Sequence, residues 1–573
     1  MITGGSLIDG TGSPARPADV AVDGDRITAV GEVGALGSAR REIDAAGKIV
    51  TPGFVDVHTH YDAQLSWDPW ITPSSWHGCT TVIVGNCGVG FAPAVPTRHN
   101  ELIELMEGVE DIPGAALVEG ITWGWESFAD YLDVLEALPH VIDFGCQIGH
   151  GPVRAYVMGD RGVRNDPATP DDIARMAQLV EDGLRAGALG FSTSQTALHK
   201  SKSGEYVPGT WVAVEEMLAM ADAMARAGLG VFQGAYDHPE LPDQFGWLRE
   251  FAERSGRPVA VNLNQTDQAP DVWKQVLRWL DEMQQAGLQV VAEVAGRSIG
   301  ILMCLEGTVH PFSLHPAYDE IASLPLAERV VELRRPERQE RLFNERQPEF
   351  GGFLDSLTRG FSKMFPAADD VIDYEPPPEA SVQALAQRRG VAPERIVLDA
   401  LLENDGHGML YYPLFNYAQG DLGVTYELHR HPGTRMGLSD GGAHCGAICD
   451  GGMPTFMLTH WTRDRTRGPR LPLEQVVHRQ TQQTAQLYAL HDRGVVAPGY
   501  RADLNVIDYD RLGFGPPRMA YDFPAGARRL VQQATGYDAT ICAGTVIAEH
   551  DEFTGALPGR LIRGPKPAPL PGP

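Results

Sequence analysis

The stretch FVDVHTHYDAQLSWDP, residues 54–69, opens with an apolar run that ends in two histidines one residue apart. The segment GFVDVH (53–58) has the length and composition of a buried β-strand. Residues i and i+2 of an extended chain point the same way, so His58 and His60 can bind one cation together. The stretch therefore predicts a buried strand that carries half of a metal site at its carboxyl end.

Strands of the same kind recur through the middle of the chain. Further apolar segments follow at 80–86, 141–149, 188–194, 229–235, 258–265, 288–296 and 435–441. Helical patterns at 170–187, 213–228 and 271–287 lie between them, each with one apolar face and a final glycine. Alternating strands and helices predict an α/β fold with a parallel sheet, and eight strands are the number that closes a (β/α)8 TIM-like barrel.

Three regions depart from this pattern. Residues 1–50 and 491–573 alternate apolar and polar positions between turns, which predicts a small β-sandwich built from both termini beside a barrel at 51–490. A long segment separates the seventh and eighth strands, with a charged stretch at 326–342 and a proline-rich patch at 374–382. We interpret residues 305–400 as an inserted helical subdomain. It either covers the barrel mouth or is a surface addition without a catalytic role.

Composition narrows the class of protein. The 573 residues are 43% apolar and 21% charged, which is typical of a folded enzyme. We expect neither a membrane span nor a secretion signal, because no long apolar run and no basic leader occur. Seven scattered cysteines do not form a disulfide framework and favour the cytoplasm. The net charge of −28 disfavours nucleic acids and anionic membranes, so the expected partner is a small molecule.

The carboxyl ends of the barrel strands are where an active site is expected. The eighth strand ends in SDGG, and its Asp440 faces the same axis as the two histidines. We predict that Asp440 binds the metal, accepts a proton from bound water, or both. The second strand ends in Cys87, which is either a thiolate ligand favoured by the cation or a small buried thiol.

Other strand ends offer groups for the substrate. The fifth and sixth strands end in Gln233 and Asn264, whose neutral amides are poor zinc ligands but good partners for a substrate amide or carboxylate. His150, after the third strand, is a further ligand or the partner of a loop carbonyl, and Arg297 could bind a substrate carboxylate. Weaker candidates at the same end of the barrel are Asn262, Gln265, His238, His444, Arg154, Lys200 and Lys202.

The segments TPGFVDVHTHYDAQ, GNCGVGFAP, GFSTS, GLSDGGAH and GYRADLNVID together resemble the amidohydrolase superfamily, and within it the N-acyl-D-amino-acid deacylase (D-aminoacylase) family. The resemblance extends over nearly the whole chain. It implies a (β/α) barrel beside a β-sandwich, with zinc at the strand ends. It also implies that His58, His60 and Asp440 hold one metal position. Cys87 then takes the place that a carboxylated lysine fills in other superfamily members.

The chain departs from the family pattern at two strands. That pattern has a histidine after the fifth strand and another, followed by a lysine, after the sixth, and these complete a second metal position with the cysteine. Here the two segments read VFQGAYD and VNLNQTD. Either the metal lies only with His58, His60 and Asp440, or a residue such as His150 assists, or the site is degenerate.

The sequence thus predicts a metal-dependent hydrolase of an amide C–N bond, acting on an N-acyl amino acid or a related amide. One or two zinc ions, or another divalent metal, would polarise the carbonyl and lower the pKa of a bound water to about 7. Asp440 would take the proton from that water and return it to the leaving nitrogen. Three alternatives stay open: a non-hydrolytic isomerase, cyclase or decarboxylase, a hydrolase of cyclic amides, and a metal-free binding protein. Assembly into a homo-oligomer is possible.

Overall fold

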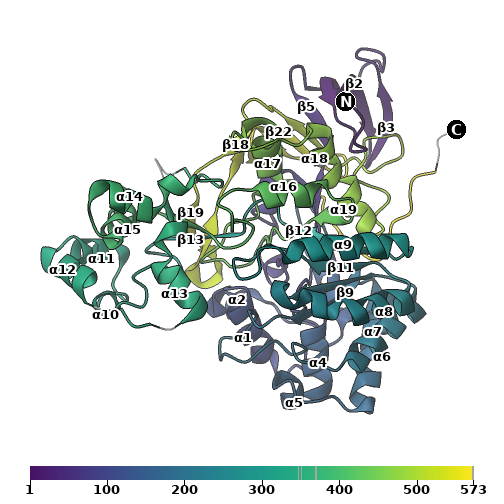
Figure 1. Ribbon diagram of the computed structural model, residues 1–573. Coiled ribbons are helices and arrows are strands. Elements are labelled where there is room, and N and C mark those ends of the chain that lie inside the picture. Colours follow the sequence, from purple (N-terminus) through teal and green to yellow (C-terminus); the bar gives the residue numbers. More distant parts are fainter. Residues whose placement is uncertain (346, 350, 368–370, 571–573) are drawn as a thin grey trace.

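The computed structural model describes residues 1–573 except 346, 350, 368–370 and 571–573. Its centre is a sheet of eight parallel strands in which each strand pairs with the next one along the ring (Figure 1). Each strand overlaps a predicted segment. The strands are β6 (Phe54–Asp56), β7 (Cys79–Val84), β8 (Asp143–Gly149), β9 (Gly190–Gln195), β10 (Val231–Tyr236), β11 (Val259–Asn262), β12 (Val290–Val294) and β16 (Thr434–Met436).

The first and last strands meet just beyond their carboxyl ends. Thr59 forms a parallel bridge with Gly441. The backbone N–H of His60 donates to the carbonyl oxygen of Gly441 at 2.8 Å, and that of Asp440 donates to the carbonyl oxygen of His58 at 3.1 Å. The ring therefore closes through the residues that carry the predicted metal ligands. The predicted barrel is confirmed.

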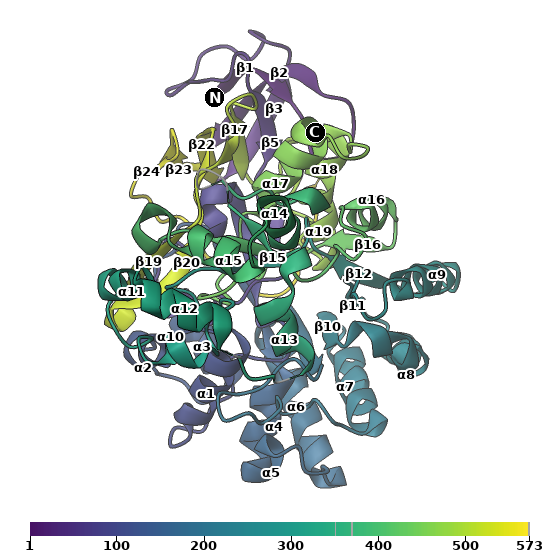
Figure 2. The ribbon, with the colours of Figure 1, turned by 60° about the vertical axis from the view of Figure 1, so that its left-hand side comes forward.

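Amphipathic helices cover the outside of the ring. Four of them, α6 (Pro170–Ala186), α7 (Val214–Ala227), α8 (Phe245–Ser255) and α9 (Val272–Gln285), lie along one side in both views (Figures 1 and 2). Thr169 starts α6 by accepting the backbone N–H of Asp172. The side chains of β7 are all buried, as expected for a strand covered on both faces. Among the described residues, no helix is long and apolar enough to cross a bilayer.

The two ends of the chain share one mixed sheet, seen at the top of Figure 2 in purple and yellow. Residues 49–52 pair in parallel with β1 on one side and antiparallel with residues 504–507 on the other. The strands are β1 (Ile2–Leu7), β2 (Arg16–Asp23), β3 (Arg26–Gly31), β4 (Ile43–Asp44), β5 (Ile49–Pro52), β17 (Leu504–Ile507), β22 (Tyr537–Cys542), β23 (Thr545–Glu549) and β24 (Glu552–Phe553). Val20, Val506 and Ile541 belong to one apolar cluster, so the sheet curls around its own core.

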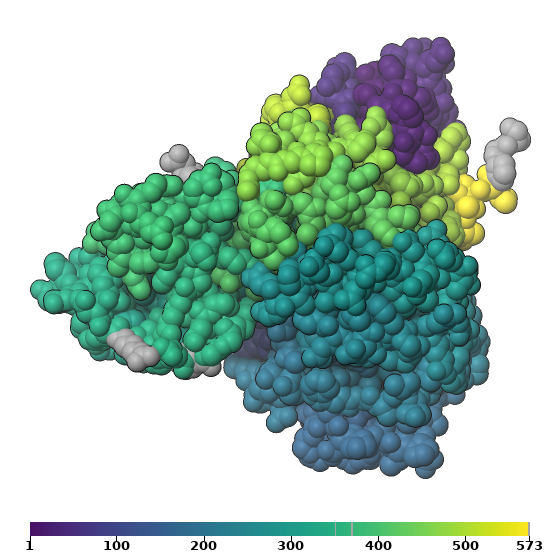
Figure 3. All heavy atoms as spheres, in the orientation of Figure 1, coloured from purple at the N-terminus to yellow at the C-terminus, as the bar shows by residue number. Residues whose placement is uncertain are grey.

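The segment between β12 and β16 forms a lobe that projects from one side of the barrel (Figures 1 and 3). Its helices are α10 (Pro316–Asp319), α11 (Leu326–Leu333), α12 (Pro336–Asn344), α13 (Gly352–Arg359), α14 (Val382–Arg389) and α15 (Pro393–Leu401). It also contains an unpredicted antiparallel sheet of β13 (Gly300–Met303), β15 (Leu410–Pro413) and β14 (Phe365–Pro366). A separate apolar cluster lies inside it. Thr308 donates to Asp111 at 2.6 Å, so the lobe borders the loops at the barrel mouth.

Candidate metal centre

His58 and His60 leave β6 together and enter the interior of the barrel. Their exposed fractions are 1% and 2%, and their ring centroids are 5.5 Å apart. Thr59 lies between them, and its hydroxyl donates to the carbonyl oxygen of Ile83 at 2.8 Å. Because the chain is extended here, both imidazoles turn away from Thr59 to the same side.

Asp440 reaches the two histidines from the other side of the closing seam. Its Oδ1 atom lies 3.4 Å from Nε2 of His58 and 3.8 Å from Nε2 of His60. The backbone of Asp440 is left-handed, with φ of 48°. Non-glycine residues in unusual backbone conformations cluster at functional sites, where the surrounding structure holds them. The structure thus brings three of the predicted metal ligands together.

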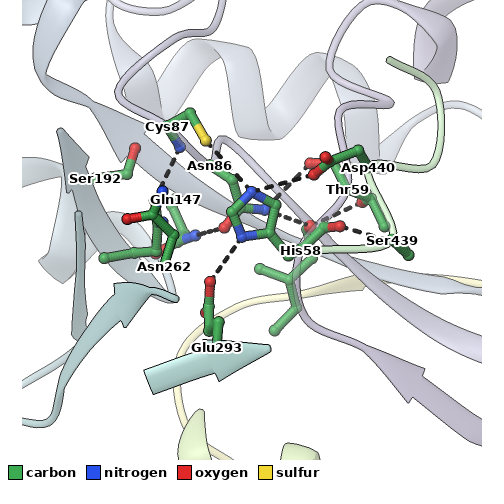
Figure 4. Close-up of polar contacts among 12 residues, drawn as sticks. His58, Thr59, Asn86, Cys87, Gln147, Ser192, Asn262, Glu293, Ser439 and Asp440 are labelled. Carbon is green, nitrogen blue, oxygen red and sulfur yellow. Dashed lines mark hydrogen bonds and ion pairs between the residues drawn. The ribbon is translucent and has the colours of Figure 1, made fainter. Parts of the chain in front are cut away.

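Cys87 approaches the same point from the loop after β7. Its Sγ atom lies 3.3 Å from Nε2 of His58 (Figure 4). Its backbone is also left-handed, with φ of 53°, and its N–H donates to Oε1 of Gln233 at 2.8 Å. Gly88 follows with φ of 68°, and a Cβ atom there would lie 2.7 Å from the backbone nitrogen of Ser194. Only glycine therefore fits beside the cysteine.

Two buried carboxylates contact the far nitrogens of the histidines. Glu293, on β12, accepts the Nδ1–H of His58 at 2.7 Å. Oε1 of Glu110, at the end of α1 (His99–Val109), lies 3.2 Å from Nδ1 of His60. Their exposed fractions are 0% and 1%. Glu293 forms a hydrogen bond, which orients the imidazole of His58 and increases its basicity, so Nε2 of His58 faces Asp440 and Cys87 as a ligand. Glu110 lies at ion-pair distance from His60 without a hydrogen bond between them.

Sequence reasoning missed both carboxylates, and it also missed His199. Glu293 had a detectable signal, because it is the one charged residue in the predicted strand LQVVAEVAG and a buried charge needs a partner. Glu110 lies in the acidic stretch MEGVEDIPG and had no such signal. His199, in the loop after β9, bonds the hydroxyl of Ser194 through Nδ1 at 3.0 Å. Burial, together with His444 and His58, lowers the pKa of His199 to about 3.

The electrostatics of the centre depend on burial and on the close packing of these groups. Burial lowers the pKa of His58, but Cys87 and Glu293 together raise it by more than burial lowers it, so the net shift is upward. Burial and the neighbouring His58 lower the pKa of His60. Burial raises the pKa of Cys87 to about 11, against the opposing effect of His58. A divalent cation reverses the balance for the thiol, because it favours the thiolate that binds it.

The donor set fits a transition-metal ion. Donor atoms of His58, His60 and Cys87 lie within 4.8 Å of one another, and Asp440 adds a carboxylate oxygen beside both imidazoles. Two imidazoles, a thiolate and a carboxylate are the ligand types of zinc and related ions. In the part of the chain that the structure describes, no other group of three His, Cys, Asp or Glu side chains is spaced to hold an ion.

His150 and Arg297 are engaged elsewhere. The Nδ1 atom of His150 bonds Thr193 at 2.9 Å and its Nε2 atom bonds Glu216 at 2.9 Å, so both ring nitrogens have structural partners. Arg297 is fully buried, pairs with Asp450 at 2.9 Å and lies over the ring of Tyr374. The predicted metal role of His150 and the predicted carboxylate role of Arg297 do not fit these contacts.

The predicted amides lie in a network at the ends of β10 and β11. Oδ1 of Asn264 accepts from Asn416 at 2.8 Å, and its Nδ2 is 3.3 Å from Nε2 of His238. Gln265 bonds the same Asn416, while Asn262 bonds the backbone of Tyr236 through both amide atoms. Among the weaker candidates, Arg154 pairs with Glu216, Lys202 with Glu107, Lys200 lies over Tyr206, and His444 is 3.9 Å from Glu110.

Comparison with known proteins identifies the family to which this chain belongs. Residues 41–548 match the amidohydrolase family. The chain belongs to the amidohydrolase family. Its match spans the barrel, the inserted lobe and part of the terminal sheet, so the family assignment covers every residue of the centre described above.

This amidohydrolase is similar to deacylases of N-acyl-D-amino acids, and the predicted resemblance is confirmed. An N-acyl-D-glutamate deacylase of Alcaligenes xylosoxydans xylosoxydans is 26% identical over 564 residues, which cover 98% of this chain and 96% of the relative. A D-aminoacylase of the same organism is 35% identical over 228 residues, 40% of this chain and 42% of the relative. A solved D-aminoacylase with a binuclear metal centre has a TM-score of 0.65 at 26% identity, covering 98% of this chain and 99% of that one.

Proposed function

We propose that this amidohydrolase removes the acyl group from N-acyl amino acids by metal-dependent hydrolysis of the amide C–N bond. The observation that carries the proposal is the convergence of four donors from three strand ends, His58, His60, Cys87 and Asp440. Zinc is the ion we propose, since it accepts this mixture of ligands. The similarity to an N-acyl-D-glutamate deacylase supports the choice of substrate class.

The four donors would hold the ion, which supplies polarisation of the amide carbonyl and acidification of a bound water. Glu293 keeps the imidazole of His58 in position by accepting its Nδ1–H, and Glu110 places a second negative charge 3.2 Å from Nδ1 of His60. Asp440 has an exposed side-chain fraction of 14%, the largest among these groups and their carboxylate partners. It is therefore the carboxylate best placed to take a proton from water and to give it to the leaving nitrogen.

We propose that the amino-acid carboxylate binds in a pocket between the loop after α1 and the inserted lobe, although no ligand of the centre lines it. Its volume is about 430 Å³, and its lining includes Asp111, Gly446 and Arg528. Asp111 follows Glu110 directly, which connects the cavity wall to the His60 partner. Arg528 is the one basic residue of the lining, and it donates to the carbonyl oxygen of Gly307 at 3.4 Å. We propose that Arg528 binds the carboxylate of the substrate.

A substrate panel tests the proposed function. The purified protein is offered N-acetyl-D and N-acetyl-L amino acids, a neutral N-acyl amine and a hydantoin, and release of free amine is measured. We expect turnover of the N-acyl amino acids, loss of turnover after chelation, and recovery on addition of zinc. Turnover of the hydantoin alone would identify a cyclic-amide hydrolase. No turnover of any amide by metal-loaded protein would contradict hydrolysis.

The absence of disulfides supports a cytoplasmic location for the enzyme. All seven cysteines are unpaired and buried. Free thiols persist in a reducing compartment, whereas secreted proteins commonly cross-link theirs. Fractionation of cells that produce the protein tests this location, and recovery outside the cytoplasm would contradict it.

A further inference from the structure

The surroundings of Cys87 bear on how many ions the centre holds. We infer that this amidohydrolase binds a single ion, that Cys87 coordinates it together with His58, His60 and Asp440, and that Gln233 holds Cys87 in position. The inference rests on the metal dependence proposed above. It sets this chain apart from the similar D-aminoacylase, which has a binuclear metal centre.

The first argument is that the thiol and the carboxylate share one nitrogen. Sγ of Cys87 lies 3.3 Å, and Oδ1 of Asp440 lies 3.4 Å, from the same Nε2 atom of His58. Figure 4 shows the two side chains on opposite sides of that ring edge. An imidazole nitrogen has one lone pair and binds one ion. Cys87 and Asp440 therefore converge on one ion and do not define two separate half-sites.

The second argument is that the side chain bonded to the backbone of Cys87 is an amide, Gln233, which turns its NH2 group and not its oxygen to the remaining space. Because Oε1 of Gln233 accepts the backbone N–H of Cys87, its Nε2 group faces the remaining space. That group is buried, has no hydrogen-bond partner and presents N–H bonds, which repel a cation. Both amide atoms of Asn262 already bond the backbone of Tyr236. Across the described ranges, no further imidazole or carboxylate completes a second set with Cys87.

The third argument assigns a role to Gln233. Cys87 has a left-handed backbone, which a non-glycine residue adopts only when its surroundings enforce it. Two hydrogen bonds enforce it here, from the N–H of Cys87 to Gln233 and from the N–H of Gly88 to the hydroxyl of Ser192 at 3.0 Å. Gln233 thus acts as a positioning residue, because it aims the thiol at the His58 nitrogen without contacting the ion.

A cobalt titration tests the inference on the full chain. The protein is stripped with a chelator and titrated with Co²⁺, while the thiolate-to-cobalt charge-transfer absorption and the cobalt retained after desalting are measured. We expect the absorption to saturate at one Co²⁺ per chain, with no second ion retained in excess cobalt. Retention of two ions, or one ion without the thiolate absorption, would overturn the inference.

Three variants separate the roles of the residues. Cys87→Ser should remove the thiolate absorption. Gln233→Leu should weaken that absorption and lower cobalt affinity about 10-fold, as changes behind metal ligands commonly do. Cys146→Ser, which removes another buried cysteine of the barrel, serves as the matched control and should change neither. An unchanged absorption and affinity in Gln233→Leu would overturn the role of Gln233.

The count of ions and the proposed reaction fail in different ways. A chain that retains two ions and hydrolyses amides would overturn the single-ion inference and leave the proposed function standing. A chain that binds one ion with the thiolate absorption but hydrolyses no amide would support the single-ion inference and contradict the proposed function.

Discussion

The Nδ1–H of His58 donates to Oε2 of Glu293 across 2.7 Å, and both side chains are buried. This bond joins the first and seventh strands of the barrel. It fixes the tautomer of His58, because a proton on Nδ1 leaves the lone pair of Nε2 free. A residue of the barrel wall thereby decides which nitrogen of a metal ligand faces the centre.

Replacement of that wall residue should weaken metal binding. In Glu293→Gln the amide no longer carries the charge that makes His58 more basic, so we expect metal affinity to fall about 10–100-fold. Competition with a chromophoric chelator measures the change. Glu282→Gln, on the exposed face of α9, is the control and should bind the metal as the parent protein does. Equal affinities for both variants would show that Glu293 does not support the ligand.

Asp440→Asn tests the proposed proton carrier. The amide keeps the size of the side chain but cannot take a proton, so we expect kcat to fall about 10²–10⁴-fold. Amine release measures the rate, and the unfolding temperature checks that the variant is folded. Asp464→Asn changes an exposed aspartate and is expected to retain full activity. A fully active Asp440→Asn enzyme would assign the proton transfer to another group.

Arg528→Gln tests recognition of the substrate carboxylate. Loss of the guanidinium should raise KM about 10-fold for N-acyl amino acids while kcat changes little, since the interaction is uniform along the reaction. A neutral N-acyl amine should show no such change. Arg518→Gln lies on the same hairpin, β19 (Arg518–Phe523) and β20 (Ala527–Val531), and is exposed, which makes it the matched control. An unchanged KM would exclude the proposed contact.

Because of Glu375, the folded protein should become less stable as the pH falls into the acid range. Burial raises the pKa of its carboxyl group, but bonds from His460, Arg465 and the backbone N–H of Leu422 lower it more, to about 2. Because the unfolded chain takes up the proton near pH 4.5, the stabilisation is complete above that pH. It is lost as the pH falls from 4.5 towards 2. Calorimetric unfolding temperatures between pH 7 and pH 3 would follow this loss.

The matching variant is Glu375→Gln, which leaves the buried guanidinium of Arg465 without its charge partner. We expect a loss of about 3–5 kcal/mol at pH 7, the usual effect of breaking a buried ion pair. The variant should also have a flatter dependence on pH below 4.5. Parallel pH curves for the two proteins would mean that Glu375 does not titrate as described.

Local patterns predicted the barrel well, because apolar strands and glycine-ended helices are encoded within short windows. The small sheet of the inserted lobe was not predictable in this way. Its strand β13 pairs with β15, whose partner residues Ile301 and Tyr412 are far apart in the chain. Such pairing depends on the tertiary fold and leaves no periodic signal in either segment.

The residues of the metal centre also fall into those that local sequence patterns predict and those that depend on the tertiary fold. The predicted ligands lie at strand ends, where the side chains of a barrel converge on the active site; they are His58, His60, Cys87 and Asp440. Glu110 directly follows helix α1 and lies close to His60 only because of the way the connection between β7 and β8 folds. Its position could not be predicted from the ends of the strands. Arg297 shows the opposite error. The sequence offers it as a candidate for binding a substrate carboxylate, yet Asp450 and the ring of Tyr374 enclose it.

The closing seam between Thr59 and Gly441 has a consequence for the order of assembly during synthesis. The ribosome releases His60 long before Asp440, because Asp440 lies 380 positions further along the chain. An ion captured early would have to wait with incomplete coordination until the eighth strand joins the first. Full coordination would then hold the two ends of the ring together, so the ion would act as a latch that secures the finished barrel.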